Sequence, residues 1–145
     1  DVWRGAWAEL EPARRGRRAT LREADGCGDP RCTADAFRLG RVFHNLFENA
    51  LAAGGESVRI DVAAEPCALD GRPAVQVTVA DDGPGLDPEQ RRRVFAPFFT
   101  TKAKGTGLGM AIARRTVEAH GGRIAVGDDG PPGATFHITL PREAP

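Results

Sequence analysis

Two amides and a carboxylate fall at spacings of i, i+3 and i+4 within the segment FHNLFENALAA, as Asn45, Glu48 and Asn49. On a helix these side chains share one face, opposite much of an apolar stripe. One amide oxygen together with nucleotide phosphates would be enough for Mg²⁺, which takes oxygen ligands and keeps several waters. The carboxylate of Glu48 could orient or deprotonate the group that attacks a γ-phosphate. Taken alone, however, such residues are ordinarily just the solvated face of an amphipathic helix.

A second carboxylate stands at a glycine turn, in the segment DDGPGLD. Asp81 directly follows an alternating stretch that ends near Ala80, and Gly83 and Gly85 allow close backbone approach to a ligand. A carboxylate at a strand end can accept a hydrogen bond from the exocyclic amine of adenine, which guanine lacks at the equivalent position. The segment therefore fits selection of ATP over GTP, although a plain β-turn explains the same residues about as well.

A glycine-rich segment, GTGLG over residues 105–109, opens a predicted helix at 107–120. The unpaired amides and the dipole of a helix N-terminus form an anion site, where phosphates can dock. A dinucleotide-binding fold is excluded because Met110 replaces the sixth-position glycine and the preceding FFTTKAK is no strand. A Walker loop is excluded because no GK[ST] follows.

Two lysines, Lys102 and Lys104, lie in a small-residue stretch between two predicted elements. A mobile lid there could bring an ammonium group to the phosphates. Solvated loop lysines are the simpler interpretation, which is strong for Lys104 and weaker for Lys102.

Periodicity predicts the elements that position these residues. Apolar residues recur at helical spacing in some segments and alternate with polar residues in others. The long helix that carries Asn45 begins at about Asp35 and ends at Gly54-Gly55, and the first helix ends at Pro12 or among the arginines that follow. The predicted helices cover 2–10, 35–53, 88–94 and 107–120, and the predicted strands cover 19–22, 58–62, 75–79, 124–126 and 135–140.

The order of these elements predicts an α+β fold, a two-layer sandwich in which helices cover one face of a mixed, mostly antiparallel sheet. Strands 58–62 and 75–79 are expected to form a hairpin around the turn-rich stretch 65–73. The length of 145 residues, with 41% hydrophobic and 28% charged residues, fits a single domain over residues 1–145.

The formal net charge of zero argues against nucleic acid or an anionic membrane surface as a partner. The densest basic run, residues 14–18, is interpreted as a solvated turn at a helix end. Cys27, Cys32 and Cys67 are an odd number in no metal-ligand spacing, which indicates reduced cytosolic thiols. No apolar run is long enough to span a bilayer, so we expect a soluble, cytoplasmic piece of a longer polypeptide whose parent could be membrane-anchored.

Together these segments resemble the ATP-binding catalytic domain of bacterial sensor histidine kinases, in the Bergerat-fold (GHKL) ATPase superfamily. The resemblance covers nearly the whole chain. The short lid and the FFTTK sequence look most like the nitrogen-regulator-type group of these kinases. It rests on an N box, a G1 box, an F box, a G2 box and a closing strand in the family's order, which read FHNLFENALAA, DDGPGLD, VFAPFFTTK, GTGLGMAIA and GATFHITLP.

The resemblance implies ATP and Mg²⁺ as cofactors and a role for each matching residue. Asn49 would hold Mg²⁺, Asn45 would contact the phosphates, Glu48 would be the catalytic acid/base and Asp81 would bind adenine. Many members carry a basic residue where this chain has Ala52, so phosphate neutralisation would fall more on Lys102. The remaining residues implied in nucleotide binding are Gly83, Gly85, Thr101, Gly105, Thr106, Gly107, Leu108, Gly109 and Thr135, of which Thr135 would support the adenine end through water.

The family's phosphoacceptor histidine lies in a helical dimerisation domain, in a motif resembling HExxxP that is absent from this sequence. His44, His120 and His137 are not credible acceptors, and His44 is interpreted as structural. The resemblance therefore implies transfer of the γ-phosphoryl group to a histidine on the dimerisation domain of the same parent kinase, with a response regulator as an indirect partner. The isolated chain is expected to be a monomer that does not phosphorylate itself.

Two other functions stay open from the sequence. An anti-sigma-type serine protein kinase shares the boxes but phosphorylates a protein hydroxyl. A non-catalytic adenine-nucleotide-binding module would keep the fold as a scaffold, although the intact Glu48 and Asn49 argue against such degeneracy.

Overall fold

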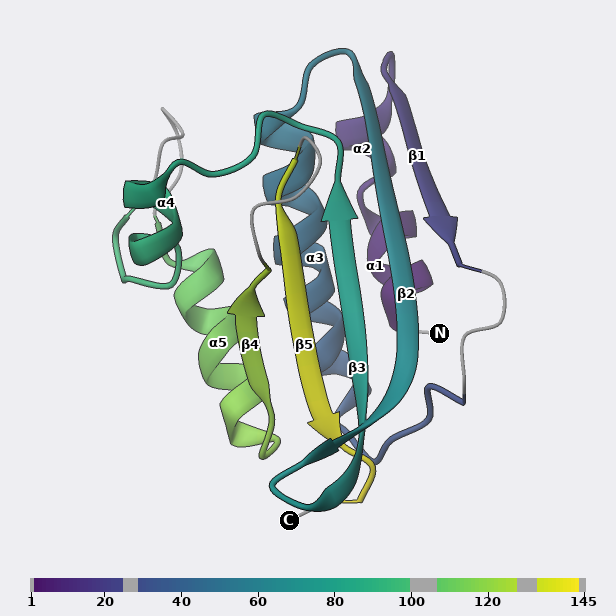
Figure 1. Cartoon of the computed structure of the whole chain (residues 1–145). Coiled ribbons are helices and arrows are strands. Elements are labelled where there is room, and N and C mark those ends of the chain that lie inside the picture. Colours follow the sequence, from purple (N-terminus) through teal and green to yellow (C-terminus); the bar gives the residue numbers. More distant parts are fainter. Residues whose placement is uncertain (1, 25–28, 100–106, 128–132, 144–145) are drawn as a thin grey trace.

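The elements of the chain follow one another as helices, a strand, a long helix, a hairpin, two helices and two strands (Figure 1). The computed structural model describes residues 2–24, 29–99, 107–127 and 133–143. The elements are α1 (Val2–Glu9), α2 (Glu11–Arg14), β1 (Arg18–Glu23), α3 (Ala36–Ala53), β2 (Ser57–Leu69), β3 (Arg72–Asp81), α4 (Pro88–Arg93), α5 (Gly109–Ala119), β4 (Arg123–Val126) and β5 (Thr135–Pro141).

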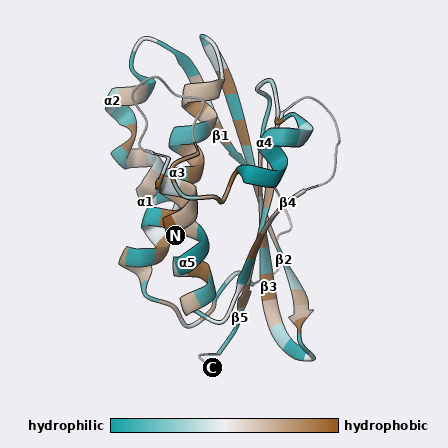
Figure 2. Cartoon of the chain, turned by 90° about the vertical axis from the view of Figure 1, so that its left-hand side faces the viewer, coloured by the Kyte–Doolittle hydropathy of each residue, from teal (hydrophilic) through white to brown (hydrophobic). Residues whose placement is uncertain are grey.

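Among the described residues, the strands form one sheet in the order β1-β2-β3-β5-β4. β1 pairs in parallel with β2, and the other neighbours pair antiparallel. Figures 1 and 2 show α1, α3 and α5 together on one face of this sheet. The predicted α+β sandwich with a mixed, mostly antiparallel sheet is therefore confirmed.

Alternation places the core between the two layers. Val75, Val77 and Val79 of β3 are buried, as is Ile60 of β2, while the residues between them are more exposed. In the register of the hairpin Val62 lies opposite Val79, so the valines of the two strands form one apolar surface beneath the helices. This surface fixes the register, because a slip by one residue would turn the valines to the other face of the sheet.

The long helix α3 packs its apolar stripe against both the sheet and α1. The Asp35 side chain caps it by accepting from the Arg38 amide at 3.0 Å. Phe43 and Phe47 are fully buried, and each meets a tryptophan of α1 edge to face, with ring centroids 5.8 Å and 5.7 Å apart.

None of the helices among the described residues is long and apolar enough to cross a membrane.

Gly54 ends α3 as predicted, but the reason is space rather than a left-handed backbone. Its φ is −78°, which any residue adopts. A Cβ at this position would lie 2.4 Å from Cγ2 of Val58, at the start of β2. Glycine is therefore required here because the chain turns closely back against the helix end.

Two boundaries differ from the sequence prediction. The hairpin turn is only Asp70-Gly71, with φ of 51° and 77°, as in a two-residue turn of type I′. The stretch 65–69, which was predicted as part of the turn, belongs to β2. Pro12 does not end the first helix but stands in the first turn of α2, where proline costs no intrahelical hydrogen bond.

The basic run at residues 14–18 forms a turn at the end of α2, as predicted, and Arg15 and Arg18 are exposed, but Arg14 and Arg17 are half-buried and packed rather than solvated. The Arg17 guanidinium donates through Nη2 to the carbonyl oxygens of Leu51 and Gly55, at 2.7 Å and 2.6 Å. These carbonyls lie at the C-terminus of α3, where the last turn lacks intrahelical donors. The guanidinium carbon of Arg14 lies 4.5 Å from the centroid of the Trp7 ring.

Replacing Arg17 with Met should therefore lower the free energy of unfolding by about 1–3 kcal/mol, because charge-assisted bonds to carbonyls at the end of α3 are lost. Chemical denaturation followed by circular dichroism measures this difference. Arg18→Met is the matched control, since Arg18 is an exposed neighbour in β1. Equal stability of the two variants would mean that Arg17 contributes nothing to the end of α3.

Candidate functional site

The carboxylate of Asp81 stands where β3 ends and is held by backbone amides from two segments. Its Oδ1 accepts from the Gly83 amide at 2.9 Å and from the Ala134 amide at 3.3 Å. The Asp81 amide in turn donates to the Ala134 carbonyl at 3.0 Å. The side chain predicted to bind adenine is therefore fixed in place by the start of β5.

Partial burial changes the acidity of this carboxyl group. Burial raises the pKa of Asp81 above its usual range, and the charge of Asp82 adds to the rise, while the amides of Gly83 and Ala134 oppose it. A desolvated carboxylate with oriented partners is typical of functional sites. Its neighbour Asp82 is engaged differently, because its Oδ1 accepts from the Arg59 amide on β2 at 2.8 Å.

Glycines let the two segments around Asp81 approach closely. Gly133 has a φ of 115°, and a Cβ there would lie 1.7 Å from the Asp81 carbonyl oxygen. Gly85, with a φ of 78°, faces Gly133, and a Cβ on it would lie 3.0 Å from the Gly133 carbonyl oxygen. The sequence prediction included Gly83 and Gly85 but missed Gly133, although a glycine directly before the closing strand was the available signal.

Thr135, which was predicted to support the adenine end of the site, lies beside this turn. In the register of β3 and β5 it is paired with Ala80, one residue before Asp81. Its carbonyl oxygen accepts from the Gly127 amide at 2.7 Å. The threonine is therefore placed by both sheet neighbours of β5.

Asn45 joins the polar face of α3 to the start of α5. Its Nδ2 donates to the Gly109 carbonyl oxygen at 3.0 Å, and a Cβ on Gly109 would lie 3.5 Å from the Asn45 carboxamide. Leu108 precedes the first turn of α5, and among the described residues no side chain caps that helix. The N-terminal backbone amides and the dipole of α5 thus lie next to the face of α3 that carries the side-chain amides of Asn45 and Asn49.

Gly107 is locked against Phe98 of the FAPFF segment. The Phe98 amide donates to the Gly107 carbonyl oxygen at 3.0 Å, and both residues have positive φ, 65° for Phe98 and 74° for Gly107. A Cβ on Gly107 would lie 2.4 Å from the Phe98 carbonyl carbon. The structure therefore ties the predicted F box to the predicted G2 box through a backbone contact that only glycine permits.

Replacing Gly107 with Ala should weaken ATP binding by about 5- to 30-fold, because a left-handed backbone costs an L-residue about 1–2 kcal/mol and the new methyl group displaces Phe98. Isothermal titration calorimetry measures the affinity. Gly5→Ala is the control: a Cβ there meets nothing within 4 Å, and alanine should stabilise α1 by about 0.5–1 kcal/mol. Wild-type affinity in a folded Gly107→Ala variant would contradict a role for this contact in the site.

Glu48 and Asn49 occupy the next turn of α3. The Glu48 side chain is 52% exposed, and its Oε2 lies 3.7 Å from Nδ1 of His44. Asn49 is half-buried. His44 was interpreted as structural, but the distance of 3.7 Å places its ring next to the Glu48 carboxylate, so it belongs to the surroundings of the proposed acid/base.

Four predicted site residues lie outside the described residues: Thr101, Lys102, Gly105 and Thr106. The same holds for Lys104. The remaining predicted residues come from α3, from the end of β3 and the turn after it, from the start of α5 and the two residues before it, and from the start of β5.

The sequence matches known proteins over most of its length. Residues 34–144 match the family model of histidine kinase-, DNA gyrase B- and HSP90-like ATPases. Sensor histidine kinase ZraS of Salmonella typhimurium is 44% identical over 111 residues, which are 77% of this chain and 23% of that protein. Sensor protein FixL of Bradyrhizobium diazoefficiens is 41% identical over 74% of this chain and 21% of its own length. The chain thus spans about a quarter of the curated relatives that it matches.

Solved structures with the same fold cover nearly all of the chain. The catalytic domain of histidine kinase ThkA superposes with a TM-score of 0.78 at 32% identity, covering 98% of this chain and 91% of that domain. Full-length ShkA, solved in complex with AMPPNP, superposes with a TM-score of 0.78 at 30% identity, covering 99% of this chain and 30% of that protein.

Proposed function

Because the chain belongs to the family of histidine kinase-, DNA gyrase B- and HSP90-like ATPases, we propose that it binds Mg-ATP and transfers the γ-phosphoryl group to a histidine on a separate dimerisation domain. The predicted resemblance to histidine kinase catalytic domains is confirmed by the family match, the sensor kinase relatives and the shared fold. What we propose beyond the family is the binding of ATP, the binding of Mg²⁺ and the transfer of the phosphoryl group.

The hydrogen bond from Asn45 Nδ2 to the Gly109 carbonyl oxygen carries the proposal. It places the face of α3 that carries the side-chain amides against the start of α5, where backbone amides can donate hydrogen bonds to phosphates. Asn49 lies one turn further along α3, so its amide oxygen would face the same phosphates. Residues that are far apart in the sequence thus supply an anion site and a neighbouring oxygen ligand.

Asp81 would select the base at the other end of the site. Both backbone bonds to its carboxylate use Oδ1, which leaves Oδ2 as the oxygen that accepts from the adenine amine. A charge-assisted bond in a partly desolvated position is stronger than one in water. Thr135, beside Ala80 in the sheet, would support the same end through water. The solved complex of ShkA with AMPPNP supports an adenine nucleotide as the ligand.

The donor set fits Mg²⁺ as well as ATP. Asn49 would supply one amide oxygen, and phosphates and water would complete the shell. The bound ion would neutralise phosphate charge and hold the phosphates in position. Lys102, which lies outside the described residues, would add a second positive charge. Glu48, exposed beside His44, would orient the acceptor imidazole or take its proton.

The sensor kinase relatives support a proposal about transfer beyond this chain. We propose that residues 1–145 are a single catalytic domain, that its acceptor histidine lies in the dimerisation domain of the same parent kinase, and that a response regulator receives the phosphate afterwards. The relatives are sensor histidine kinases, which favours a histidine acceptor over the serine acceptor of the anti-sigma-type alternative.

Radiolabelled ATP tests this proposal. The chain alone should bind Mg-ATP in calorimetry but take up no label, whereas adding the parent's dimerisation domain should give acid-labile phosphate on that domain. Acid-labile phosphate on the chain alone would contradict the acceptor assignment. Acid-stable phosphate on a protein hydroxyl would favour the serine kinase, and binding without any transfer would favour the non-catalytic module.

A further inference from the structure

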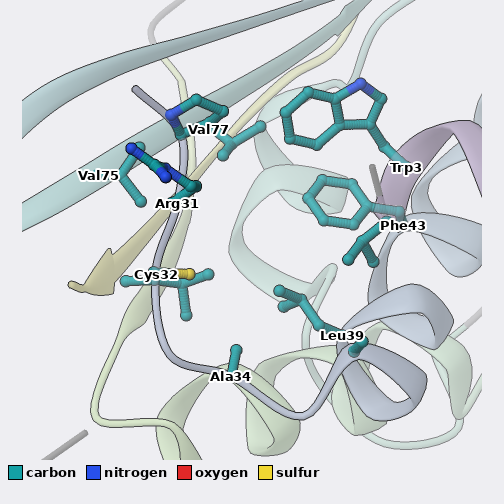
Figure 3. Close-up of a pocket in the computed structure, with 12 residues that line it drawn as sticks. Trp3, Arg31, Cys32, Ala34, Leu39, Phe43, Val75 and Val77 are labelled. Atoms are coloured by element: carbon teal, nitrogen blue, oxygen red, sulfur yellow. The ribbon is translucent and has the colours of Figure 1, made fainter. Parts of the chain in front are cut away.

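A cavity of about 250 Å³ lies between α1, α3, the sheet and the segment 30–34 that precedes α3 (Figure 3). Trp3 and Phe43 line one side of it, and Val75 and Val77 of β3 line another. Val75 precedes Asp81 on β3 by about 20 Å of extended strand. The cavity is therefore separate from the carboxylate that would bind adenine.

The walls of the cavity offer apolar contact rather than hydrogen bonds. The indole N–H of Trp3 is already used, because it donates to the Glu23 carboxylate of β1. Burial raises the pKa of the Cys32 thiol, so that wall is uncharged at neutral pH. An apolar cavity of about 150 Å³ holds one benzene molecule. The larger volume here suits an aromatic ring with a short substituent.

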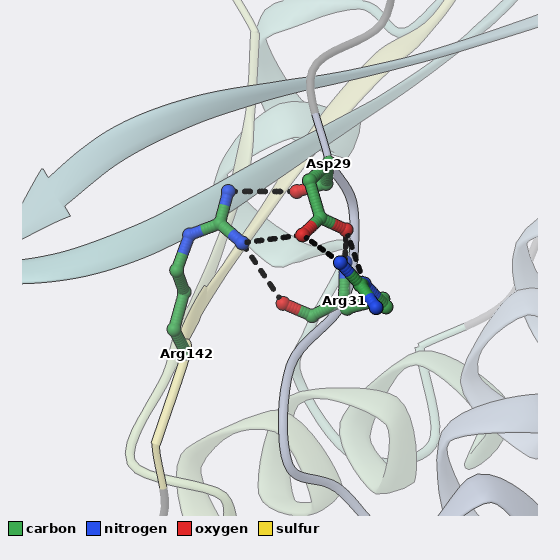
Figure 4. A network of polar contacts seen from close by, with 3 residues as sticks. All are labelled: Asp29, Arg31 and Arg142. Carbon is green, nitrogen blue, oxygen red and sulfur yellow. Dashed lines mark hydrogen bonds and ion pairs between the residues drawn. The ribbon is translucent and has the colours of Figure 1, made fainter.

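Beside the cavity, Arg31 belongs to a polar network with Asp29 and Arg142, which Figure 4 shows. Arg31, which lines the cavity, donates through Nε and Nη2 to the Asp29 carboxylate at 2.8 Å and 2.9 Å. Arg142 donates to the carbonyl oxygens of Asp29 and Arg31, at 2.7 Å and 3.1 Å. The Arg31 guanidinium lowers the pKa of Asp29 to about 2, so this carboxylate is ionised at neutral pH. Within this network two guanidinium groups and one carboxylate leave one net positive charge, and the Glu23 carboxylate next to Trp3 is balanced by its ion pair with Arg4.

We infer that this cavity binds a small monocarboxylate with an apolar body of about one aromatic ring. The body would lie against Trp3 and Phe43, where it is removed from water. The carboxylate would lie at the rim and accept from Arg31, whose five N–H donors exceed those that Asp29 uses. An amine with the same body would meet the net positive charge at the rim instead.

Three probes with one phenylethyl-type body separate the two parts of the inference: phenylacetate, 2-phenylethanol and phenethylamine. Phenylacetate should bind about two- to fivefold more tightly than the alcohol, because its ion pair with the exposed Arg31 is weak, and the amine should bind least. At ten times its Kd, phenylacetate should raise the Tm by about 3–6 °C. In ¹H–¹⁵N spectra the signals of Trp3, Leu39 and Val75 should shift, while those of Asp81 and Gly109 should not.

Variants decide whether the cavity or the rim binds the probes. Ala34→Leu fills the cavity and should abolish binding of all three, whereas the same substitution at the exposed Ala8 of α1 should change nothing. Arg31→Gln should make phenylacetate and the alcohol equal. Cys32→Met fills the cavity from another wall and replaces Ala34→Leu if that variant does not fold.

Three results would overturn the inference. The first is the absence of any shift at Trp3 or Val75 with phenylacetate up to its solubility limit. The second is unchanged binding in the folded, cavity-filled variant, which would mean an ion held at the surface only. The third is phenethylamine binding as tightly as phenylacetate, because the rim charge would then play no part.

Discussion

Replacing Glu48 with Gln is expected to slow phosphoryl transfer to the dimerisation domain by about 10²- to 10⁴-fold, which is the usual contribution of a positioned acid or base. Glutamine keeps the size and hydrogen bonding of the side chain but cannot take a proton. ATP affinity should stay nearly intact, because the Glu48 side chain is 52% exposed and need not touch the nucleotide before the reaction. Single-turnover transfer with saturating ATP and calorimetric binding measure the two effects separately.

Asn49→Ala should behave differently from Glu48→Gln, because loss of a metal ligand lowers Mg-ATP affinity and transfer together. Glu56→Gln is the matched control, since Glu56 is an exposed glutamate just beyond the end of α3. Transfer at the wild-type rate by Glu48→Gln would remove the catalytic role from this carboxylate. Positioning by Mg²⁺ and by the segment that contains Lys102 would then have to account for the reaction.

Replacing Asp81 with Ala is expected to weaken ATP binding by about 10- to 150-fold, which corresponds to about 1.5–3 kcal/mol for a charge-assisted hydrogen bond. The structure adds a complication, because alanine also leaves the Gly83 and Ala134 amides without their acceptor. Asp81→Asn separates the two effects. Its carboxamide oxygen can still accept from both amides, while its NH₂ group faces the adenine amine and cannot accept from it.

The asparagine variant should lose ATP affinity yet keep or gain stability. A carboxyl pKa raised by burial means that the folded state binds more protons than the unfolded state, so Asp81 reduces stability as the pH rises from its ordinary pKa to its raised pKa. At neutral pH the neutral amide avoids this cost. Calorimetry with ATP and thermal melting without nucleotide measure both quantities. Unchanged ATP affinity in folded Asp81→Ala and Asp81→Asn would reduce this turn to a structural feature.

The sequence by itself determined the elements whose signals are local. Helix α3 follows from apolar residues at helical spacing, and Asp35 caps it through a residue three positions away. The hairpin strands follow from alternation, and the short helix predicted at 88–94 is α4, which the structure closes with a capping box at Asp87 and Gln90. The four boxes follow one another in a fixed order, so the family could also be identified before any contact was known.

Helix and strand limits were predicted less well where glycine, proline and turn-forming residues can stand either in a turn or inside a helix or strand. The stretch 65–69 contains a proline and reads as a turn, but pairing with β3 holds it as a strand. Pro12 reads as a helix end, but it stands in the first turn of α2. In both places the neighbouring elements decide between two conformations that the local sequence permits.

The tertiary structure alone decided which residues meet. β5 lies between β3 and β4, which no local pattern specifies, and this order places Gly133 and Ala134 against Asp81. Asn45 meets Gly109, 64 positions away, and Arg17 meets the end of α3. Spacing along the chain fixes only which side chains share a face of one element, whereas contacts between elements depend on how the apolar faces pack against one another. For this reason the sequence could name most of the site residues but could not identify the backbone contacts that hold them.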